Sequence, residues 1–343
     1  MAELMSLEGV TKHFLLPATL LSKLIARERD RVVHAVNGVT LSVTEHETLG
    51  LVGESGSGKS TLGRVAIRLA DATGGRITYQ GHDITRLSGR DLRTLRQDLQ
   101  IVFQNPYASL NPRKNVRQIV GAALEARGVT SVGAQEREIR ALLKRVSLPE
   151  RFMSAYPHQL SGGQRQRVSI LRTLAVRPKL VVADEPVSAL DVSVQAQILR
   201  LLQELKEEYG LTYVFIAHDL RVVHNICDRV AVMYLGKVVE FAGSGDLFRE
   251  PLHPYTSGLL EAIPRLDRRD AYRDRIVLTG TIPSPLAPPG GCAFHTRCPV
   301  KIGRVCEEHE PPMREARPGH MVACHLYDLE QAAQAGERTF GTR

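Results

Sequence analysis

The 343-residue sequence contains no apolar run that approaches the roughly 20 residues needed to span a bilayer. Its first residues also lack the basic segment and apolar core of a secretory signal. We therefore expect the chain to stay in the cytosol. Cysteine is scarce, and in that reducing compartment its five residues are expected to be thiols rather than disulfides.

Internal repeats and low-complexity tracts are absent from the sequence. Aromatic residues make up only 5% of the chain, and we find no RNA- or DNA-binding motif in which aromatics are set among basic residues. The formal net charge is +8, but acids and bases are interleaved, as between Arg265 and Arg275. Interleaved charges are typical of a solvated surface, so no nucleic acid partner is expected. Contact with a membrane complex explains the net charge equally well.

The bulk composition is that of an ordinary globular protein, with 43% apolar and 24% charged residues. The length suits one large domain with an appendage. After Pro264 the composition changes, because prolines and glycines cluster from Pro283 to Gly291 and four of the five cysteines follow. We predict a large domain over residues 1–260 and a small cysteine-rich unit over residues 261–343.

Residues 50–64 carry the most specific motif. Gly53 to Ser60 match the phosphate-binding pattern G-x-x-x-x-G-K-[ST], between an expected strand and an expected helix. Glycines let backbone N–H groups turn toward an anion, Lys59 adds a charge for the β- and γ-phosphates, and the Ser60 hydroxyl can bind Mg²⁺. The predicted nucleotide-binding residues are Gly53, Ser55, Gly56, Ser57, Gly58, Lys59, Ser60 and Thr61.

The first expected strand, residues 4–14, ends at Phe14. An aromatic side chain there could stack on a purine base, and packing at the sheet edge is the alternative. Residues 15–31 then place apolar and basic residues at helical spacing, which is typical of a surface helix and also of a contact with a membrane partner.

Strand and helix patterns alternate along the rest of the chain. Helical patterns dominate residues 106–151 and recur at 194–209, and strand patterns occupy 34–43, 47–52, 99–104, 180–183 and 212–217. This alternation predicts an α/β fold with a mainly parallel sheet covered on both faces and a helical insertion.

A second group of polar residues follows about a hundred residues after the phosphate loop. Ser161 is a good N-cap for a helix that runs to Ala175, and Gly162 and Gly163 leave N–H groups uncovered at its positive end, which predicts a second anion site. Asp184 and Glu185 close an apolar strand. The first can hold Mg²⁺, and the second can polarise a water molecule for in-line attack.

Together these motifs resemble the ATP-binding subunit of an ABC transporter, over residues 1 to about 250. The matches are Gly53–Thr61 to the Walker A loop, Gln104 to the Q-loop, Leu160–Gln164 to the signature, Leu180–Glu185 to Walker B, Ser188–Asp191 to the D-loop and His218 to the switch histidine. The resemblance implies a P-loop NTPase with a helical subdomain inserted at about 105–175. It also implies an ATPase that uses ATP and Mg²⁺.

The resemblance implies a role for each of these residues. Two such subunits would close head to tail over two ATP molecules. Glu185 would orient the attacking water, His218 would contact the γ-phosphate, and Gln104 would sense a metal held by Ser60 and Asp184. The residues expected to contact the nucleotide across the dimer, or beside it in the D-loop, are Ser161, Gly162, Gly163, Gln164 and Asp191.

A narrower resemblance is to the oligopeptide/dipeptide import family. It rests on Ala108–Arg113, His253–Thr256, Ile282–Pro285 and the tail Gly291–Pro299. The segment between Phe14 and His34, together with Thr61, resembles the second of that family's two ATPase subunits. The implied partners are two transmembrane permease subunits, a related ATPase subunit or a second copy, and indirectly an external solute-binding protein. The implied location is peripheral, on the cytoplasmic face of the inner membrane, and the transported substrate stays open.

Cys292, Cys298, Cys306 and Cys324 have the spacing C-x5-C-x7-C-x17-C, without the short knuckle common in structural zinc sites. Four thiols in a Pro/Gly-rich loop favour a soft metal. Iron–sulfur clusters accept irregular spacing, and the similar tail of the peptide-import family is associated with a [4Fe–4S] cluster. Zinc and unmetallated thiols are the alternatives.

Two other function classes fit the sequence less well than transport. A soluble ABC-type ATPase acting on nucleic acid or ribosomes usually has two fused cassettes or a long coiled-coil insertion, and this chain has neither. A small-molecule kinase would leave Leu160–Gln164 and His218 unexplained. The sequence therefore favours a transport ATPase that powers import of peptides or related small solutes.

Overall fold

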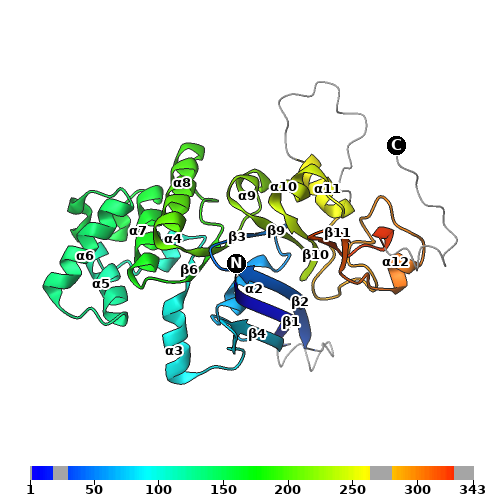
Figure 1. Cartoon of the computed structure of the whole chain (residues 1–343), viewed down its shortest axis with the longest axis horizontal. Helices are drawn as coiled ribbons and strands as arrows, with labels where there is room; N and C mark the ends of the chain where they lie inside the picture. The colour runs from blue at the N-terminus through cyan, green and yellow to red at the C-terminus, as the bar shows by residue number, and fades with distance from the viewer. Residues whose placement is uncertain (1, 18–29, 263–279, 328–343) are drawn as a thin grey trace, which may run out of the picture.

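Two sheets organise the part of the chain that this computed structural model describes, residues 2–17, 30–262 and 280–327 (Figure 1). The larger has the strand order β11-β12-β10-β9-β3-β8-β7-β6, and the smaller has the order β2-β1-β4-β5. The strands of the larger sheet are β3 (Thr48–Val52), β6 (Leu99–Val102), β7 (Leu180–Asp184), β8 (Thr212–Ile216), β9 (Arg229–Tyr234), β10 (Lys237–Gly243), β11 (Arg314–Arg317) and β12 (His320–Val322).

The strands from β9 to β6 run parallel to one another. Strands β3, β7 and β8 are buried at every residue, and their nearly continuous apolar runs are typical of strands covered on both faces. The predicted parallel α/β sheet is confirmed for this part of the molecule. Because the strands are parallel, their carboxyl ends lie along one edge of the sheet.

The other strands are antiparallel, which differs from the expectation of one mainly parallel sheet. Strand β10 pairs antiparallel with β9 and β12, and β12 pairs antiparallel with β11. The smaller sheet is antiparallel throughout, with β1 (Glu3–Leu16), β2 (Arg31–Thr44), β4 (Gly74–Tyr79) and β5 (His82–Asp83). An alternating pattern indicates a strand with one buried face, but it does not identify the partner strand.

Helix α2 (Lys59–Ala66) lies between the two sheets. Its side chains Leu62 and Val65 share one apolar cluster with Leu7 and Ile77 of the smaller sheet and Leu51 of the larger. Removing these side chains from water holds the helix in place, and with it the loop that precedes it.

Helices occupy one end of the molecule, and the C-terminal segment with α12 lies at the opposite end (Figure 1). Side chains of α5 and α7, such as Leu124 and Leu171, share one core. The helices at that end are α4 (Pro106–Ser109), α5 (Val116–Ala126), α6 (Val132–Arg145) and α7 (Gly162–Ala175), with 3₁₀ turns at Glu150–Ser154 and Pro157–Gln159. Elsewhere lie α3 (Gly89–Asp98), α8 (Val192–Tyr209), α9 (Leu220–Ile226), α10 (Ser244–Arg249), α11 (Pro254–Glu261), α12 (Val305–Glu308) and a 3₁₀ turn at His325–Tyr327.

In these described ranges, no helix has the combined length and apolar character that crossing a bilayer requires. Most of the amphipathic segment expected at residues 15–31 falls at 18–29, which lie outside the described residues.

The C-terminal segment continues the larger sheet, although the sequence suggested a separate small unit. Strand β12 pairs with β10, and the fully buried carboxylate of Glu240 on β10 binds three groups around it. It accepts hydrogen bonds from the backbone N–H groups of Leu252 (2.7 Å) and His253 (2.9 Å), and His320 Nε2 lies 2.7 Å from Oε1. A buried carboxylate requires such partners, so Glu240 ties β12 and the start of α11 to the sheet.

His253 gives this region a dependence on pH. Its Nδ1 accepts a hydrogen bond from the backbone N–H of Tyr255 (3.1 Å) and caps α11. Burial lowers the pKa of His253 to about 4, against an opposing effect of the Glu240 charge. The unfolded imidazole has a pKa near 6.5, so this stabilisation is complete above about pH 6.5 and is lost progressively as the pH falls toward 4.

We expect the free energy of unfolding to fall by about 2 kcal/mol between about pH 7 and about pH 5 because of His253. The variant His253→Asn keeps a capping acceptor but does not titrate, so it should lose less over the same range. Denaturant unfolding of both proteins at the two pH values measures the difference. Equal losses in the two proteins would contradict the assignment.

Candidate functional site

The predicted phosphate loop joins β3 to α2, and three of its glycines, Gly53, Gly56 and Gly58, have backbone conformations that other residues rarely adopt. Gly53 has φ +145° and Gly58 has φ +101°. A Cβ atom would lie 2.2 Å from the Met233 carbonyl oxygen at Gly53, and 2.2 Å from the Ala35 carbonyl oxygen at Gly58. No side chain fits at that separation, so both positions require glycine.

Lys59 lies at the start of α2, with its side chain folded back over the loop. Its ammonium group donates to the carbonyl oxygens of Gly53 (2.7 Å) and Glu54 (2.9 Å) and contacts Ser57 Oγ at 3.3 Å. Burial lowers the pKa of Lys59, while the charges of Glu185, Asp184 and Glu54 oppose that shift. The loop therefore holds a partly desolvated cation beside its own backbone, where an anionic ligand is favoured.

Ser60 and Asp184, two of the three predicted magnesium ligands, are in direct contact, and the third, Gln104, contacts Glu185. Ser60 Oγ donates to Asp184 Oδ1 at 2.6 Å, and Arg64 Nη2 lies 3.3 Å from Oδ2. Asp184 is the last residue of β7 and is only 1% exposed. A hydroxyl and a carboxylate side by side are hard oxygen donors, so this pair fits Mg²⁺.

The three predicted catalytic residues beyond the loop also meet. Glu185 Oε2 accepts a hydrogen bond from Gln104 Nε2 at 2.8 Å and lies 3.2 Å from His218 Nδ1. These residues follow the carboxyl ends of β7, β6 and β8, which is where open parallel sheets bind ligands. Glu185 has φ +47°, and its backbone N–H donates to Ile216 O, so the turn that aims its carboxylate is held against the neighbouring strand.

The signature residues lie apart from this group. Ser161 and Gln164 form a reciprocal cap at the start of α7, with Ser161 N–H donating to Gln164 Oε1 (2.9 Å) and Gln164 N–H to Ser161 Oγ (3.3 Å). A Cβ at Gly163 would lie 2.6 Å from Val194 Cγ1, so the glycine allows α7 to approach α8. Among the described residues, no hydrogen bond or ion pair joins this helix start to Lys59, Ser60 or Glu185.

The remaining predicted residues have simpler surroundings. Phe14 lies near the end of β1, 42% exposed, with Lys12 Nζ 5.0 Å from its ring centroid. Gly56 has nothing within 4 Å of a built Cβ atom, so the loop faces open space there, next to Ser55. Asp191 is the N-cap residue of α8, and Thr61 lies in the first turn of α2. Base stacking by Phe14 stays a prediction.

Sequence reasoning missed a contact between the phosphate loop and the C-terminal segment. Arg297 Nη1 lies 2.7 Å from Glu54 Oε2, and Nη2 lies 3.0 Å from Oε1. The backbone N–H of Glu54 donates to Tyr255 Oη at 2.8 Å. Glu54 occupies a position that the loop pattern leaves open, and Arg297 follows it by 243 residues. No local sequence signal links the two.

The four C-terminal cysteines line one narrow cavity of about 10 Å³, which is room for little more than one water molecule. Burial raises the pKa of Cys292 to about 11 and that of Cys324 to about 12. In the described ranges, no group of three or more His, Cys, Asp or Glu side chains is arranged to hold a metal ion. The structure therefore does not support the expected iron–sulfur or zinc site as formed.

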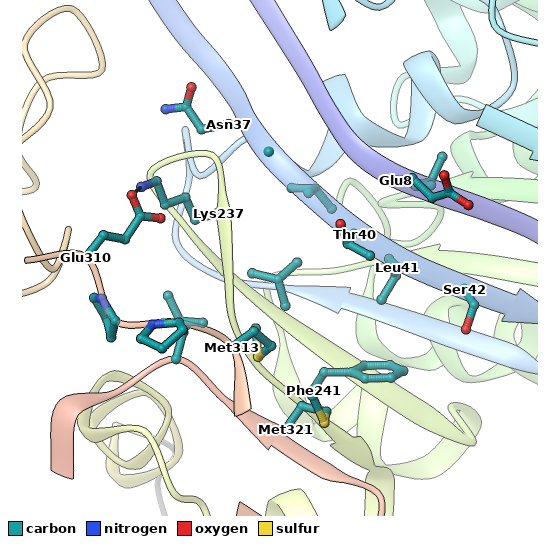
Figure 2. A pocket seen from close by; sticks show the side chains of 18 of the residues that line it. Glu8, Asn37, Thr40, Leu41, Ser42, Lys237, Phe241, Glu310, Met313 and Met321 are labelled. Atoms are coloured by element: carbon teal, nitrogen blue, oxygen red, sulfur yellow. Dashed lines mark ion pairs between the residues drawn. The ribbon is translucent and has the colours of Figure 1, made fainter. Parts of the chain in front are cut away.

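A larger groove of about 900 Å³ lies between β2 and the β10–β12 region (Figure 2). Thr40 and Ser42 line one side, Phe241 and Met321 line the other, and an ion pair joins Lys237 to Glu310. Of the predicted site residues, only Cys292 borders this groove.

Comparisons with known proteins agree with this geometry. Residues 36–188 match the model of the ABC transporter family, and residues 239–306 match that of the oligopeptide/dipeptide transporter C-terminal region. The chain is 49% identical over 326 residues to the oligopeptide transport ATP-binding protein AppF of Bacillus subtilis, covering 94% of this chain and 97% of that protein. It is 51% identical over 301 residues to YkfD of the same organism, covering 87% and 91%.

A solved structure is also similar. The dimeric ATP-binding cassette MJ0796, in a post-hydrolysis state bound to ADP and Pi, superposes with a TM-score of 0.61 at 30% identity, covering 70% of this chain and 98% of that one. The shared fold and the long match to AppF settle the family. The chain belongs to the ATP-binding proteins of ABC transporters, and carries the C-terminal region of the oligopeptide/dipeptide group.

Proposed function

We propose that this chain hydrolyses ATP to power the import of peptides through a membrane ABC transporter. The observation that carries the proposal is the contact of Gln104 and His218 with the Glu185 carboxylate, beside the Ser60–Asp184 pair. The similarity to AppF, an oligopeptide transport ATP-binding protein, supports peptides as the cargo. None of the relatives named above is described as acting on nucleic acid or ribosomes, so that alternative gains no support.

Each side chain has a definite part in this proposal. Lys59 would bind the phosphates, and Ser60, Asp184 and the amide oxygen of Gln104 would hold Mg²⁺, which would supply positive charge to neutralise the phosphates. Glu185 accepts a hydrogen bond from the attacking water and orients it in line with the γ-phosphate. His218 and the Gln104 amide hold the Glu185 carboxylate in place, and His218 reaches toward the γ-phosphate.

We further propose that the signature residues act on the nucleotide of a second subunit. Ser161, Gly162 and Gly163 lie at the start of α7 and, within the part of the chain that the structure describes, make no hydrogen bond or ion pair with Lys59 or Glu185, which supports a role across a dimer. Asp191, at the start of α8, would lie at the same interface, and Phe14 would stack on the adenine of its own site. The similar MJ0796 cassette is itself described as dimeric. The second subunit is a related ATPase chain or a second copy.

We also propose a wider assembly, which the family membership supports. The chain would lie on the cytoplasmic face of the inner membrane, bound to two permease subunits and served indirectly by an external solute-binding protein. Of the two different ATPase subunits of such importers, it would correspond to the second. We also propose an ATPase domain over residues 1–260, with a helical subdomain at about 105–175, and a C-terminal extension over 261–343. Helices α4 to α7 support the subdomain bounds, although the C-terminal family match begins earlier, at residue 239.

The cysteine cavity is proposed as a structural metal site, with a [4Fe–4S] cluster preferred over zinc. Cys292, Cys298, Cys306 and Cys324 all border it, and four thiols are the donor set that both alternatives require. The narrow cavity means that the side chains must turn toward an incoming metal. Burial raises the pKa of Cys292, Cys298 and Cys324 and so keeps these thiols protonated until then, and metal binding would therefore release protons.

Glu185→Gln should lower ATP turnover by at least about a hundredfold, because an amide is a far weaker acceptor for the attacking water. ATP binding should persist, since Lys59 and Ser60 are unchanged. Turnover and nucleotide binding are measured on the purified chain, and uptake of labelled peptide in cells. Glu204→Gln, an exposed acid on α8, is the matched control. Unchanged turnover in Glu185→Gln would refute the assignment.

Anaerobic purification followed by absorption spectroscopy and metal analysis tests the cysteine proposal. A [4Fe–4S] site predicts a brown protein with about four irons, lost in Cys298→Ser and Cys306→Ser. Cys227→Ser serves as the control, because that buried thiol lies outside the cavity. A colourless protein with one zinc ion would show that the site binds zinc and not an iron–sulfur cluster. A protein without metal would refute both metal assignments.

A further inference from the structure

The phosphate loop carries a carboxylate, and that carboxylate has a partner from the opposite end of the sequence. Both terminal nitrogens of Arg297 donate to the Glu54 carboxylate, Nη1 to Oε2 at 2.7 Å and Nη2 to Oε1 at 3.0 Å. The Arg297 side chain is 4% exposed and that of Glu54 is 25% exposed. A two-point arginine–carboxylate contact shielded from water is among the strongest polar pairings in proteins.

Aromatic side chains fix the arginine in this position. Tyr234 Oη lies 3.5 Å from Arg297 Nη1, and the guanidinium lies 5.8 Å from the Tyr234 ring centroid. The Tyr234 ring packs on Tyr255 (4.8 Å between centroids) and on Phe294 (5.3 Å), and Tyr255 Oη accepts the backbone N–H of Glu54. Glu54, one of the two residues whose carbonyl oxygens bind Lys59, is thus held both by its backbone and by its side chain.

Glu54 without a partner would work against nucleotide binding. It adds a negative charge to a loop whose other features all favour phosphate, and like charges repel strongly where water is partly excluded. Arg297 cancels that charge and directs the carboxylate toward the C-terminal segment.

We propose that Arg297 is a positioning residue for the nucleotide site, which it serves by neutralising Glu54 and fixing the conformation of the phosphate loop. This inference rests on the proposed function, because it assumes that the loop binds ATP. Arg297 itself is not expected to touch the nucleotide.

The proposal predicts how the Kd for ATP differs among four variants. Arg297→Gln leaves a carboxylate unpaired beside the phosphates, and should raise the Kd for ATP by about tenfold or more. Glu54→Gln removes the repelling group and should change the Kd by no more than about threefold. The double variant Glu54→Gln/Arg297→Gln should recover most of the affinity that Arg297→Gln loses. Arg297→Lys keeps the charge but not the two-point contact, and should lie between wild type and Arg297→Gln.

The experiment measures the Kd for ATP by calorimetry with the full chain, along with kcat and KM of hydrolysis. Thermal unfolding of each variant checks that it is folded. Arg304→Gln, an exposed arginine in the same segment, controls for loss of one positive charge and should match wild type. The KM for ATP should rise in Arg297→Gln with kcat nearly unchanged, because the loss is one of ground-state binding.

Two results would overturn the proposal. One is an affinity in Arg297→Gln equal to that of wild type, and the other is a double variant at least as weak as Arg297→Gln, which is what a purely structural arginine would give. If Arg297→Gln does not fold, Arg297→Lys and its combination with Glu54→Gln carry the same comparison. Failure of the wild-type chain to bind ATP would instead overturn the proposed function.

Discussion

The nucleotide site depends on one packing constraint, the burial of strands β3, β7 and β8 on both faces. Such strands carry apolar side chains along their length, so polar side chains first become possible where the strands end. The ends of parallel strands share one edge, and this brings Asp184, Glu185 and His218 beside the phosphate loop. Residues far apart in sequence are thereby placed within hydrogen-bond distance without any long loop to guide them.

The parts of this arrangement that sequence could predict are those with local patterns. The loop glycines, Lys59 and the strand that ends at Asp184 each carry a recognisable spacing, and the structure places them together. The smaller antiparallel sheet was not predicted as a separate sheet, because alternation in β1 and β2 reveals a buried face and not a partner. The sequence predicted Ser161 as the N-cap of α7, and the structure adds Gln164 as its reciprocal partner, so two residues expected to contact the nucleotide also cap the helix.

Contacts of the C-terminal segment lay beyond sequence reasoning altogether. Glu240 and Glu54 are ordinary acids in the sequence, and only the folded chain shows that each is bound by residues from that segment. Neither contact is predicted by a periodic pattern or by a motif in the sequence. The segment looked like an appendage because its composition changes abruptly, yet composition reports on local chain properties and not on which strands pair. It is joined to the sheet by β12 and to the phosphate loop by Arg297.

The separation of Glu54 and Arg297 has a consequence for synthesis. Ribosomes add about 5–20 residues per second, so Arg297 is made roughly 12 to 50 seconds after Glu54. By the end of that interval the nascent chain has the parallel strands and the phosphate loop, but not yet the arginine that binds Glu54. Under the role proposed for Arg297, the phosphate loop would reach its nucleotide-binding conformation only after the C-terminal segment has been made and has folded onto it.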